Sequence, residues 1–387
     1  MLFRYTLRNL LLHRSSSVPT ALAIMATIAM VTGLLGILEG LYATILNSGI
    51  PDNVIVLSEG ASVESESAID LPALAKIKIA PGVSSSEGQQ LISVEYVTLL
   101  SLRTVDGHLG TLTLRGVDPA AYLVHRVEAR GGLPDGQSNS GVLAGDRQLD
   151  RFALLPGDNV LIGRKSWPVV GTLVAPGSKF GSELWADRQA LMTERHRIKP
   201  TAVVVRLSSA DQFPAFAAAV HAIADQRLTA VTETQYYHRL SEGLEPLFKA
   251  VLLMLVVVIL GAIAACSAAM YTLFLGRVRE LATLLAIGFQ RGRVGLLIVM
   301  ESVWLALAGG GVGVALMIPF AGRSLSIGSL GAGLGVGDEQ MPLVYNLIIS
   351  GRVALAAAAV SLLIGLVGGL LPFVYVLRLR VVEAIHD

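Results

Sequence analysis

Long apolar stretches without charged residues alternate with polar segments along this chain. Four such stretches occur, one near the N-terminus and three after residue 249: residues 15–38, 250–276, 302–322 and 353–377. At about 1.5 Å per residue, each forms a helix long enough to cross a hydrocarbon layer of about 30 Å. The pattern therefore predicts a membrane protein with four transmembrane α-helices in a 1+3 arrangement and a large extracytoplasmic α+β domain between helices 1 and 2.

The arginines predict which side of the membrane each segment occupies. They gather at three places, which are Arg4, Arg8 and Arg14, then Arg277, Arg279, Arg291 and Arg293, and finally Arg378 and Arg380. By the positive-inside rule these places are cytosolic, so both termini lie inside and the protein lies in the cytoplasmic (inner) membrane. A signal peptide would also carry arginines before an apolar run, but this run is too long for one. An uncleaved anchor is favoured.

The expected segments follow in chain order. They are a cytosolic N-terminal segment 1–17, helix 1 at 18–40, the extracytoplasmic domain 41–249, helix 2 at 250–276, a cytosolic coupling helix 277–293, helix 3 at 294–322, an extracytoplasmic loop 323–352, helix 4 at 353–377 and a cytosolic tail 378–387.

The extracytoplasmic segment has the pattern of an α+β domain in two lobes. In the first lobe, about residues 50–100 and 196–234, strands are expected at 53–57, 91–100, 201–207 and 228–232, and helices at 71–79 and 211–227. In the second, β-rich lobe, about 101–195, strands are expected at 111–117, 159–162 and 166–173. This second lobe is inserted into the first. Residues 235–249 predict a helical stalk with a kink at Gly243 and Pro246.

Composition limits the chemistry of the chain. With 53% hydrophobic residues, 15% charged residues and a net charge of +1, neither a soluble protein nor a nucleic-acid partner is favoured. Cys266 is the single cysteine, so no disulfide forms within one chain. None of the six lysines follows a glycine, which excludes a phosphate-binding Gly-Lys-Ser/Thr loop, and no His-Glu-x-x-His or Gly-x-Ser-x-Gly pattern occurs. We therefore expect a non-catalytic chain without a metal or cofactor of its own.

The loop between helices 2 and 3 predicts a short amphipathic helix. Leu281, Leu284, Leu285 and Gly288 fall on one face of it, Arg277, Arg279 and Glu280 flank that face, and Gly288 is a natural stop. Such a helix either docks into a groove on a cytosolic partner or lies in the lipid headgroups, and periodicity alone leaves both open.

Small residues recur four apart in every span, at 36 and 40, 261 and 265, 309 and 313, and 365 and 369. They favour close helix packing within the chain and against a second copy, although glycine is common in membrane helices generally. Glu301 lies near the cytosolic end of its span. We expect it to pair with an arginine of the inner loop in a structural or coupling role, rather than to relay protons.

Aromatic residues gather near the expected membrane surface on the outer side: Tyr42, Tyr236, Tyr237 and Phe248. They either grip a hydrophobic cargo or form only an interfacial aromatic belt, and the sequence leaves both readings open.

Several segments resemble one known superfamily. Residues 277–294, RVRELATLLAIGFQRGRV, resemble the Arg-x-Arg-Glu-Ile/Leu-x-x-Leu-x-Ala-Ile/Leu-Gly signature of ABC-transporter permeases of the MacB, LolC and FtsX superfamily. Further similarity lies in Glu301-Ser302, in residues 5–10, and in the ending from Leu371-Pro372 to residue 385. Two positions depart from the pattern, Val382 where Pro is frequent and Leu285 where Arg is frequent. Residues 56–61 and 181–187 resemble stand-alone permeases rather than MacB, which carries a fused ATPase.

The resemblance implies a porter-like first lobe and a chain that works as a homodimer, or as a pair with a close relative, bound to two ABC ATPase subunits. ATP and Mg would be bound by those subunits, and outer-domain movement would export or extract a hydrophobic, lipid-like or peptide cargo by mechanotransmission. A membrane fusion protein and an outer-membrane channel are further partners in the superfamily. The alternative is a membrane-anchored sensor or regulator of cell-envelope enzymes, FtsX-like, with no transported substrate.

Overall fold

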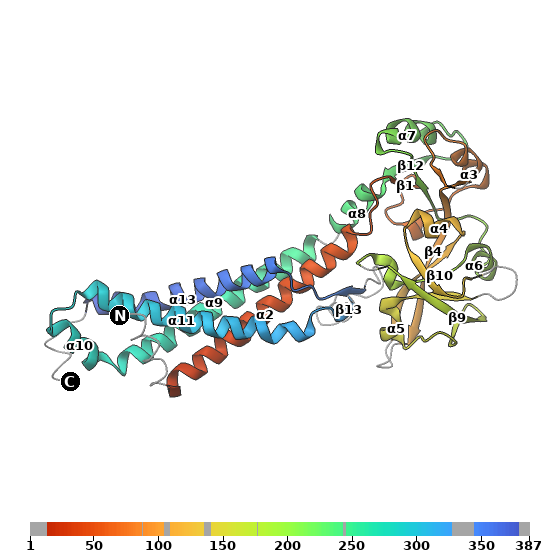
Figure 1. Ribbon diagram of the computed structural model, residues 1–387. Coiled ribbons are helices and arrows are strands. Elements are labelled where there is room, and N and C mark those ends of the chain that lie inside the picture. Colours follow the sequence, from red (N-terminus) through yellow and green to blue (C-terminus); the bar gives the residue numbers. More distant parts are fainter. Residues whose placement is uncertain are drawn as a thin grey trace. The chain divides into compact units, whose positions relative to one another are not determined.

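The structure is a computed structural model that describes residues 14–86, 88–103, 109–134, 141–175, 177–242, 245–326 and 344–378. The chain divides into two compact units. One, the helical unit, is drawn from Met1–Glu39, Glu245–Arg323 and Leu347–Asp387; the other, the α/β unit, is drawn from Gly40–Leu244 and Ser324–Asn346. Figure 1 labels most of their α-helices and several of their strands.

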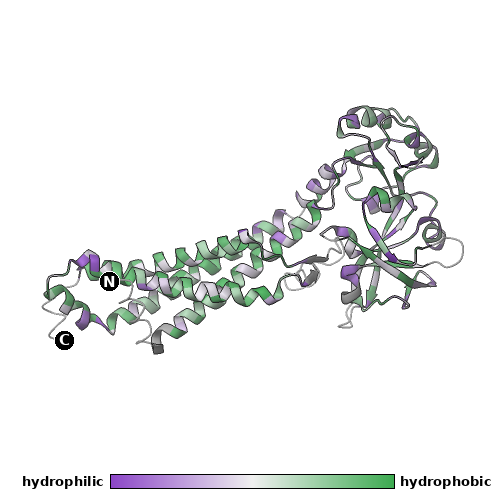
Figure 2. Cartoon of the chain, in the orientation of Figure 1, coloured by the Kyte–Doolittle hydropathy of each residue, from purple (hydrophilic) through white to green (hydrophobic). Residues whose placement is uncertain are grey.

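The helical unit contains the four long apolar helices. Its elements are α2 (Arg14–Leu46), whose last turns belong to the α/β unit, α9 (Glu245–Leu275), α10 (Val278–Ala286), α11 (Arg291–Met317), η4 (Ile318–Phe320) and α13 (Gly351–Arg378). Within the described residues, four helical stretches are long and apolar enough to cross a membrane: Val18–Leu46, Phe248–Leu275, Arg291–Phe320 and Gly351–Arg378. Figure 2 shows how apolar residues dominate them. The predicted 1+3 arrangement is confirmed.

Small residues bring these helices into close contact. A Cβ atom at Gly313 would lie 2.5 Å from the carbonyl oxygen of Met25 on α2, and one at Gly365 would lie 2.8 Å from Cα of Val303 on α11. A Cβ at Gly261, by contrast, would meet nothing within 4 Å. The small residues of α11 and α13 therefore serve packing inside this chain, as expected of helices that approach backbone to backbone.

The α/β unit is built on one mixed sheet. Within the described residues its ten strands are β1 (Asn53–Ser58), β4 (Ile92–Arg103), β5 (Leu109–Val117), β6 (Glu128–Gly131), β7 (Val142–Gly145), β8 (Asn159–Ile162), β9 (Lys165–Val174), β10 (Glu183–Asp187), β11 (Ala202–Arg206) and β12 (Leu228–Thr232). Their order is β12-β1-β11-β4-β5-β10-β7-β9-β6, with β8 added beside β9. Two small hairpins pair β2 (Ser85–Ser86) with β3 (Gln89–Gln90), and β13 (Ser324–Ser326) with β14 (Val344–Asn346).

Short helices connect and cover the strands. They are η1 (Glu64–Glu66), α3 (Leu71–Lys78), α4 (Ala120–Val124), α5 (Asp146–Phe152), η2 (Lys179–Ser182), α6 (Arg188–Glu194), η3 (Ala210–Gln212), α7 (Phe213–His221) and α8 (Glu233–Glu242). The predicted helix at 211–227 is too long, because α7 ends at His221. Beyond it, the Gln226 amide accepts from Asp70 N and donates to Ala68 O, and these bonds draw the chain back towards α3.

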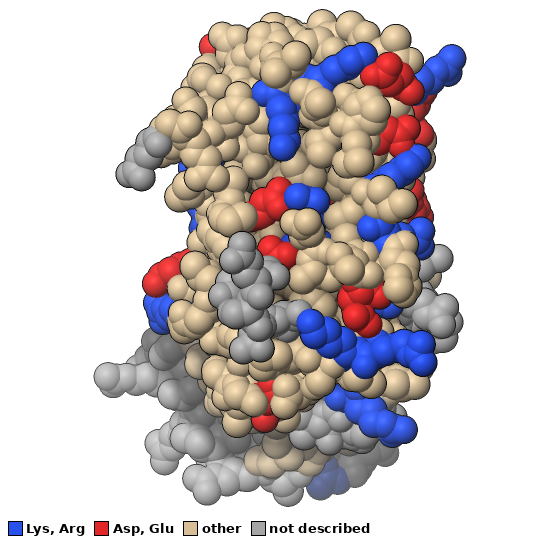
Figure 3. Space-filling view, turned by 90° about the vertical axis from the view of Figure 1, so that its right-hand side faces the viewer, with Lys and Arg blue, Asp and Glu red and all other residues tan. Residues whose placement is uncertain are grey.

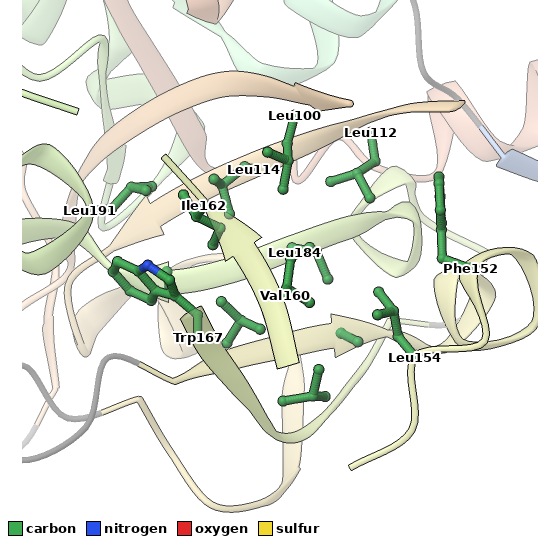
Figure 4. Packing of buried hydrophobic residues seen from close by; sticks show 14 of the residues in the cluster. Leu100, Leu112, Leu114, Phe152, Leu154, Val160, Ile162, Trp167, Leu184 and Leu191 are labelled. Atoms are coloured by element: carbon green, nitrogen blue, oxygen red, sulfur yellow. The ribbon is translucent and has the colours of Figure 1, made fainter. Parts of the chain in front are cut away.

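Strand β4 joins the two lobes. Its first half pairs with β11, its second half with β5, and the change falls between Glu95 and Tyr96. Ile92 and Val94 pack into the core of the first lobe with side chains of β1, β11, α3 and α7. Tyr96 and Leu100 pack into the core of the second lobe, around Trp167, which Figure 4 shows from close by. The single strand β4 thus contributes side chains to the cores of both lobes.

Several predicted features lie partly or wholly outside the described residues. Residues 5–10, residues 327–343 in the middle of the predicted loop 323–352, and residues 379–387 are not described. In the predicted stalk, α8 ends at Glu242 and α9 begins at Glu245, with Gly243 and Leu244 outside the described residues. Pro246 occupies the first turn of α9, where its missing N–H costs no helical hydrogen bond.

Candidate functional site

The helix α10 packs its leucine face against its own unit. Leu281 is buried, and Leu284 and Leu285 are half-buried, in a cluster with Phe274 of α9, Val294 and Ile298 of α11, and Val376 of α13. The sequence offers a cytosolic partner or the lipid headgroups as cover for this face, but the ends of three long helices of the same chain cover it. Its leucines anchor α10 and leave the opposite face exposed.

The exposed side of α10 ends in a defined turn. Gly288 has a φ of +100°, and Phe289 N donates to Leu284 O at 3.1 Å while Gly288 N donates to Leu285 O at 3.1 Å. This is the Schellman arrangement that glycine favours at a helix C-terminus, and it confirms the predicted stop. Beyond the last helical residue, Ile287 is 72% exposed and Phe289 is 47% exposed. Arg279 and Glu280 are also exposed on this side.

An ion pair fixes the start of α10. Arg277 Nη1 lies 3.0 Å from Glu301 Oε2 and 3.2 Å from Glu301 Oε1, and both side chains are only about a tenth exposed. Arg277 Nε is also 3.4 Å from Glu280 Oε2. Glu301 therefore pairs with an arginine of the loop, as the sequence indicates. Its part in coupling stays a prediction.

The four aromatic residues fall into two groups. Tyr42 is 44% exposed and Phe248 is half-buried. Tyr236 and Tyr237, on α8, are buried with ring centroids 5.2 Å apart. Neither buried ring offers a surface to a cargo or to lipid headgroups in this structure, because both pack into the interior of the α/β unit.

Behind these tyrosines lies a buried cluster of charged side chains that the sequence reading missed. Its centre is Arg115 of β5, which is fully buried. Arg115 donates to Glu183 of β10 at 2.7 and 2.9 Å and to Glu64 of η1 at 2.9 and 3.1 Å, in two bidentate pairs. It also donates to Glu95 of β4. One guanidinium thus holds three carboxylates from three different elements.

Two further cations extend the cluster in opposite directions. Lys179 Nζ donates to Glu64 Oε2 at 2.8 Å, and its ammonium lies 4.8 Å from the ring centroid of Tyr237. On the other side, His125 Nε2 lies 2.6 Å from Glu95 Oε1, and His125 Nδ1 lies 3.6 Å from Glu233 Oε1. We call these seven residues, Glu64, Glu95, Arg115, His125, Lys179, Glu183 and Glu233, the buried charge cluster.

Mutual attraction keeps the cluster charged. Burial alone raises the pKa of Glu95, but the charges of His125 and Arg115 lower that pKa to about 2. Burial lowers the pKa of His125, but Glu95 and Glu233 raise it to about 9. The pKa of Glu64 is likewise held well below its usual value by Arg115 and Lys179, against the effect of burial. Glu64 and Glu95 are therefore carboxylates, and His125 is a cation, at neutral pH.

The surface of the α/β unit has a different character. Figure 3 shows one face, on which Lys and Arg side chains are interspersed with Asp and Glu side chains among neutral residues. Among the described residues, no group of three or more His, Cys, Asp and Glu side chains is arranged to hold a metal ion. In the buried charge cluster, Arg115 occupies the position between the carboxylates.

These parts define a class of protein: an integral membrane protein in which one apolar helix precedes, and three follow, a folded α/β unit. Residues 17–223, more than half of the chain, match the family described as the MacB-like periplasmic core domain. The chain therefore belongs to this family, and so to the MacB/FtsX-like superfamily of ABC permeases.

Solved structures similar to part of the chain include two extracytoplasmic domains. One is the periplasmic region of MacB from Actinobacillus actinomycetemcomitans, at 11% identity and a TM-score of 0.38, covering 51% of this chain and 95% of that one. Another is the extracellular domain of the noncanonic ABC-type transporter YknZ from Gram-positive bacteria, at 15% identity and a TM-score of 0.36, covering 46% and 99%. Comparison with curated protein sequences gives no match.

Membership in the family settles the general setting of the chain. It is a multi-pass protein of the cytoplasmic membrane, and its α/β unit is extracytoplasmic. The family consists of transporter permease subunits, which are generally non-catalytic and work with an ABC ATPase.

Proposed function

We propose that the chain couples ATP binding and hydrolysis by a separate ABC ATPase to movement of its extracytoplasmic unit. That movement exports or extracts a hydrophobic, lipid-like or peptide cargo by mechanotransmission. ATP and Mg are bound by the ATPase and not by this chain. The observation that carries the proposal is α10, a short helix anchored on one face to the ends of three long helices and exposed on the other.

The exposed side of α10 is the proposed ATPase contact. Arginines gather in this loop, so the positive-inside rule puts α10 on the cytosolic side of the membrane. Ile287 and Phe289 provide apolar area there, and Arg279 and Glu280 provide charge beside it. The leucines Leu281, Leu284 and Leu285 lie on the opposite face of α10, where they pack into the core of the helical unit. Since Leu281 joins the core that contains Val294 and Val376, a push on α10 reaches α11 and α13 directly.

The Arg277–Glu301 pair gives a second connection from the loop to the membrane helices. Arg277 precedes α10 at its N-cap, and Glu301 lies in α11, so the pair ties the start of α10 to the helix that follows it. A rigid loop transmits displacement better than a mobile one. We therefore assign the pair to coupling rather than to proton transfer.

A second copy of the chain, or a close relative, completes the proposed assembly with two ATPase subunits. The small residues of α11 and α13 face helices of the same chain, whereas a Cβ at Gly261 of α9 would meet nothing within 4 Å. The face of α9 around Gly261 and Ala265 thus supports contact with another helix. Cargo handling falls to the extracytoplasmic unit, because the centres of the spans carry no charged residue to line a polar route.

The coupling surface is tested by copurification of the ATPase with the full-length chain. Ile287→Asp with Phe289→Asp should abolish copurification while the permease stays folded in the membrane, because both side chains are exposed. Ile198→Asp is the matched control, since Ile198 is 77% exposed in the α/β unit, and it should retain the ATPase. Undiminished ATPase binding by the double variant would rule out this surface.

A regulator of cell-envelope enzymes that moves no cargo is the remaining alternative. It predicts the same ATPase contact and the same movement of the α/β unit. The two differ when the assembled complex is purified and its bound small molecules are identified by mass spectrometry. A bound hydrophobic molecule that ATP hydrolysis releases favours transport.

A further inference from the structure

The buried charge cluster lies at the two ends of the segment Gly40–Leu244, where the chain arrives from α2 and leaves through α8. At the end of α2, Ser48 Oγ accepts from Lys179 N at 2.7 Å. Two residues further on, Ile50 N donates to Glu233 Oε2 at 3.0 Å. The chain that leaves α2 is therefore hydrogen-bonded to the backbone of Lys179 and to the side chain of Glu233, two members of the cluster.

The start of α8 is held by the same cluster. Glu233, its first residue, also accepts from Asn53 Nδ2 at 2.9 Å. One turn later, Tyr236 Oη accepts from Glu64 N at 3.2 Å, and the ring of Tyr237 packs beneath the ammonium of Lys179. After α8 the chain continues, two residues on, into α9. The chain that leaves α2 and the start of α8 are thus held by one set of charges.

The cluster also bridges the two lobes. Arg115 and Glu183 stand on neighbouring strands of the second lobe, β5 and β10. Glu95 stands on the half of β4 that pairs with β11 in the first lobe. Bidentate and charge-assisted hydrogen bonds link these side chains through the single guanidinium of Arg115. A displacement of one lobe relative to the other must break several of these bonds at once.

Stability alone is a weak reason for such a cluster. Apolar side chains of similar volume stabilise a protein interior as well as buried ion pairs do, or better, because charges lose their hydration on burial. What a directional ionic network adds is a fixed geometry among the elements that it joins. Here those elements are the end of α2, the start of α8 and both lobes.

We propose that the buried charge cluster is the joint that makes the end of α2, the start of α8 and the two lobes move as one body. Lys179, Glu64 and Tyr236 position α8 against the lobes, and Glu233 positions the chain that leaves α2. The inference rests on the proposed function, since a joint matters only if movement is transmitted.

A matched pair of conservative variants separates the joint from general packing. Tyr236→Phe removes the hydroxyl that accepts from Glu64 N. Tyr237→Phe, one residue on, removes a buried hydroxyl that has no hydrogen-bond partner in the described structure. Both keep their aromatic rings, so both should fold. Lys179→Met is the stronger variant, because it removes the bond to Glu64 and the cation above Tyr237.

The measurement is hydrogen–deuterium exchange of the full-length chain with its copurified ATPase, without nucleotide and with ATP trapped by vanadate. In the wild type we expect nucleotide-dependent changes in peptides of α8, of β12 in the first lobe and of β9 in the second. In Tyr236→Phe the changes in β12 and β9 should fall by roughly threefold to tenfold, the effect of one hydrogen bond on an equilibrium. Lys179→Met should lose them, and Tyr237→Phe should match the wild type. ATP hydrolysis should persist in all three.

Each outcome decides one claim. If Tyr236→Phe and Lys179→Met show the full wild-type change in both lobes, the cluster is not the joint, although the proposed function stands. If the wild type itself shows no nucleotide-dependent change in either lobe, the proposed function fails and the joint fails with it. If Tyr237→Phe loses the change as fully as Tyr236→Phe, the effect comes from packing of α8, and the assignment of the hydrogen bond is overturned.

Discussion

Replacing Arg115 by methionine should be the most damaging single change in the α/β unit. Methionine fills much of the volume but leaves Glu64, Glu95 and Glu183 buried without their common partner. Removing one partner of a buried ion pair costs about 3–5 kcal/mol, because the remaining charge stays desolvated. For a folded unit of about 200 residues, 1 kcal/mol lowers Tm by about 2–4 °C. We therefore expect Tm to fall by roughly 6–20 °C at neutral pH.

The stability of Arg115→Met should change with pH in the opposite direction to that of the wild type. In the wild type, the low folded-state pKa of Glu95, about 2, contributes stability that is present above its unfolded value of 4.5. That contribution is lost as the pH falls through the folded value. Without Arg115, burial should raise the pKa values of Glu64 and Glu95 from their low wild-type values, although Lys179 and His125 still face these carboxyls. Acidification then protonates the buried carboxylates of the variant. The loss of stability relative to the wild type should therefore be smaller at pH 5 than at pH 8.

Thermal unfolding of the full-length chain in detergent, followed by tryptophan fluorescence, measures both effects. Trp185 Nε1 donates to Glu183 Oε2 at 2.9 Å, so this residue reports on the cluster directly. Arg188→Met is the control, because the Arg188–Asp118 pair is about a quarter exposed and worth at most about 1 kcal/mol. A loss of stability no larger than that of Arg188→Met, or a deficit that is the same at both pH values, would refute the reasoning.

Two further predictions concern stability. The pKa of His125 is raised to about 9 from 6.5. Protonated His125 therefore contributes up to about 3 kcal/mol to the free energy of unfolding, in full below pH 6.5, and this contribution is lost as the pH rises through 9. His125→Gln should remove the corresponding slope from a plot of Tm against pH. In the helical unit, Gly313→Ala places a Cβ 2.5 Å from Met25 O and should cost about 1–3 kcal/mol by thermal unfolding in detergent, whereas Gly311→Ala meets nothing within 4 Å and should be neutral; equal effects would contradict the packing argument.

Hydrophobic pattern predicts most of the fold, because it reports burial directly. The four apolar helices, the strands β1, β11 and β12, and the stop of α10 at Gly288 all follow from local residues. The leucine face of α10 shows the limit of such reasoning. Amphipathicity reveals that a face must be covered but not by what, and the cover consists of Phe274, Ile298 and Val376, which lie on three helices far apart in sequence.

The buried charge cluster was hidden for a related reason. Alternation along β4 puts Ser93 and Glu95 on the face opposite Val94, and a polar face of a strand is ordinarily a solvent face. In the structure both faces are buried, because η1, α4 and α8 bring Glu64, His125 and Glu233 over the polar one. The cations that hold Glu95, Arg115 and His125, lie 20 and 30 positions away in the chain, and no local spacing relates them. What the sequence does contain is a single arginine within the strand pattern of residues 109–117, where an outward-facing arginine and a buried one look the same. Only the set of elements that covers β5 distinguishes them, and that is a property of the tertiary fold.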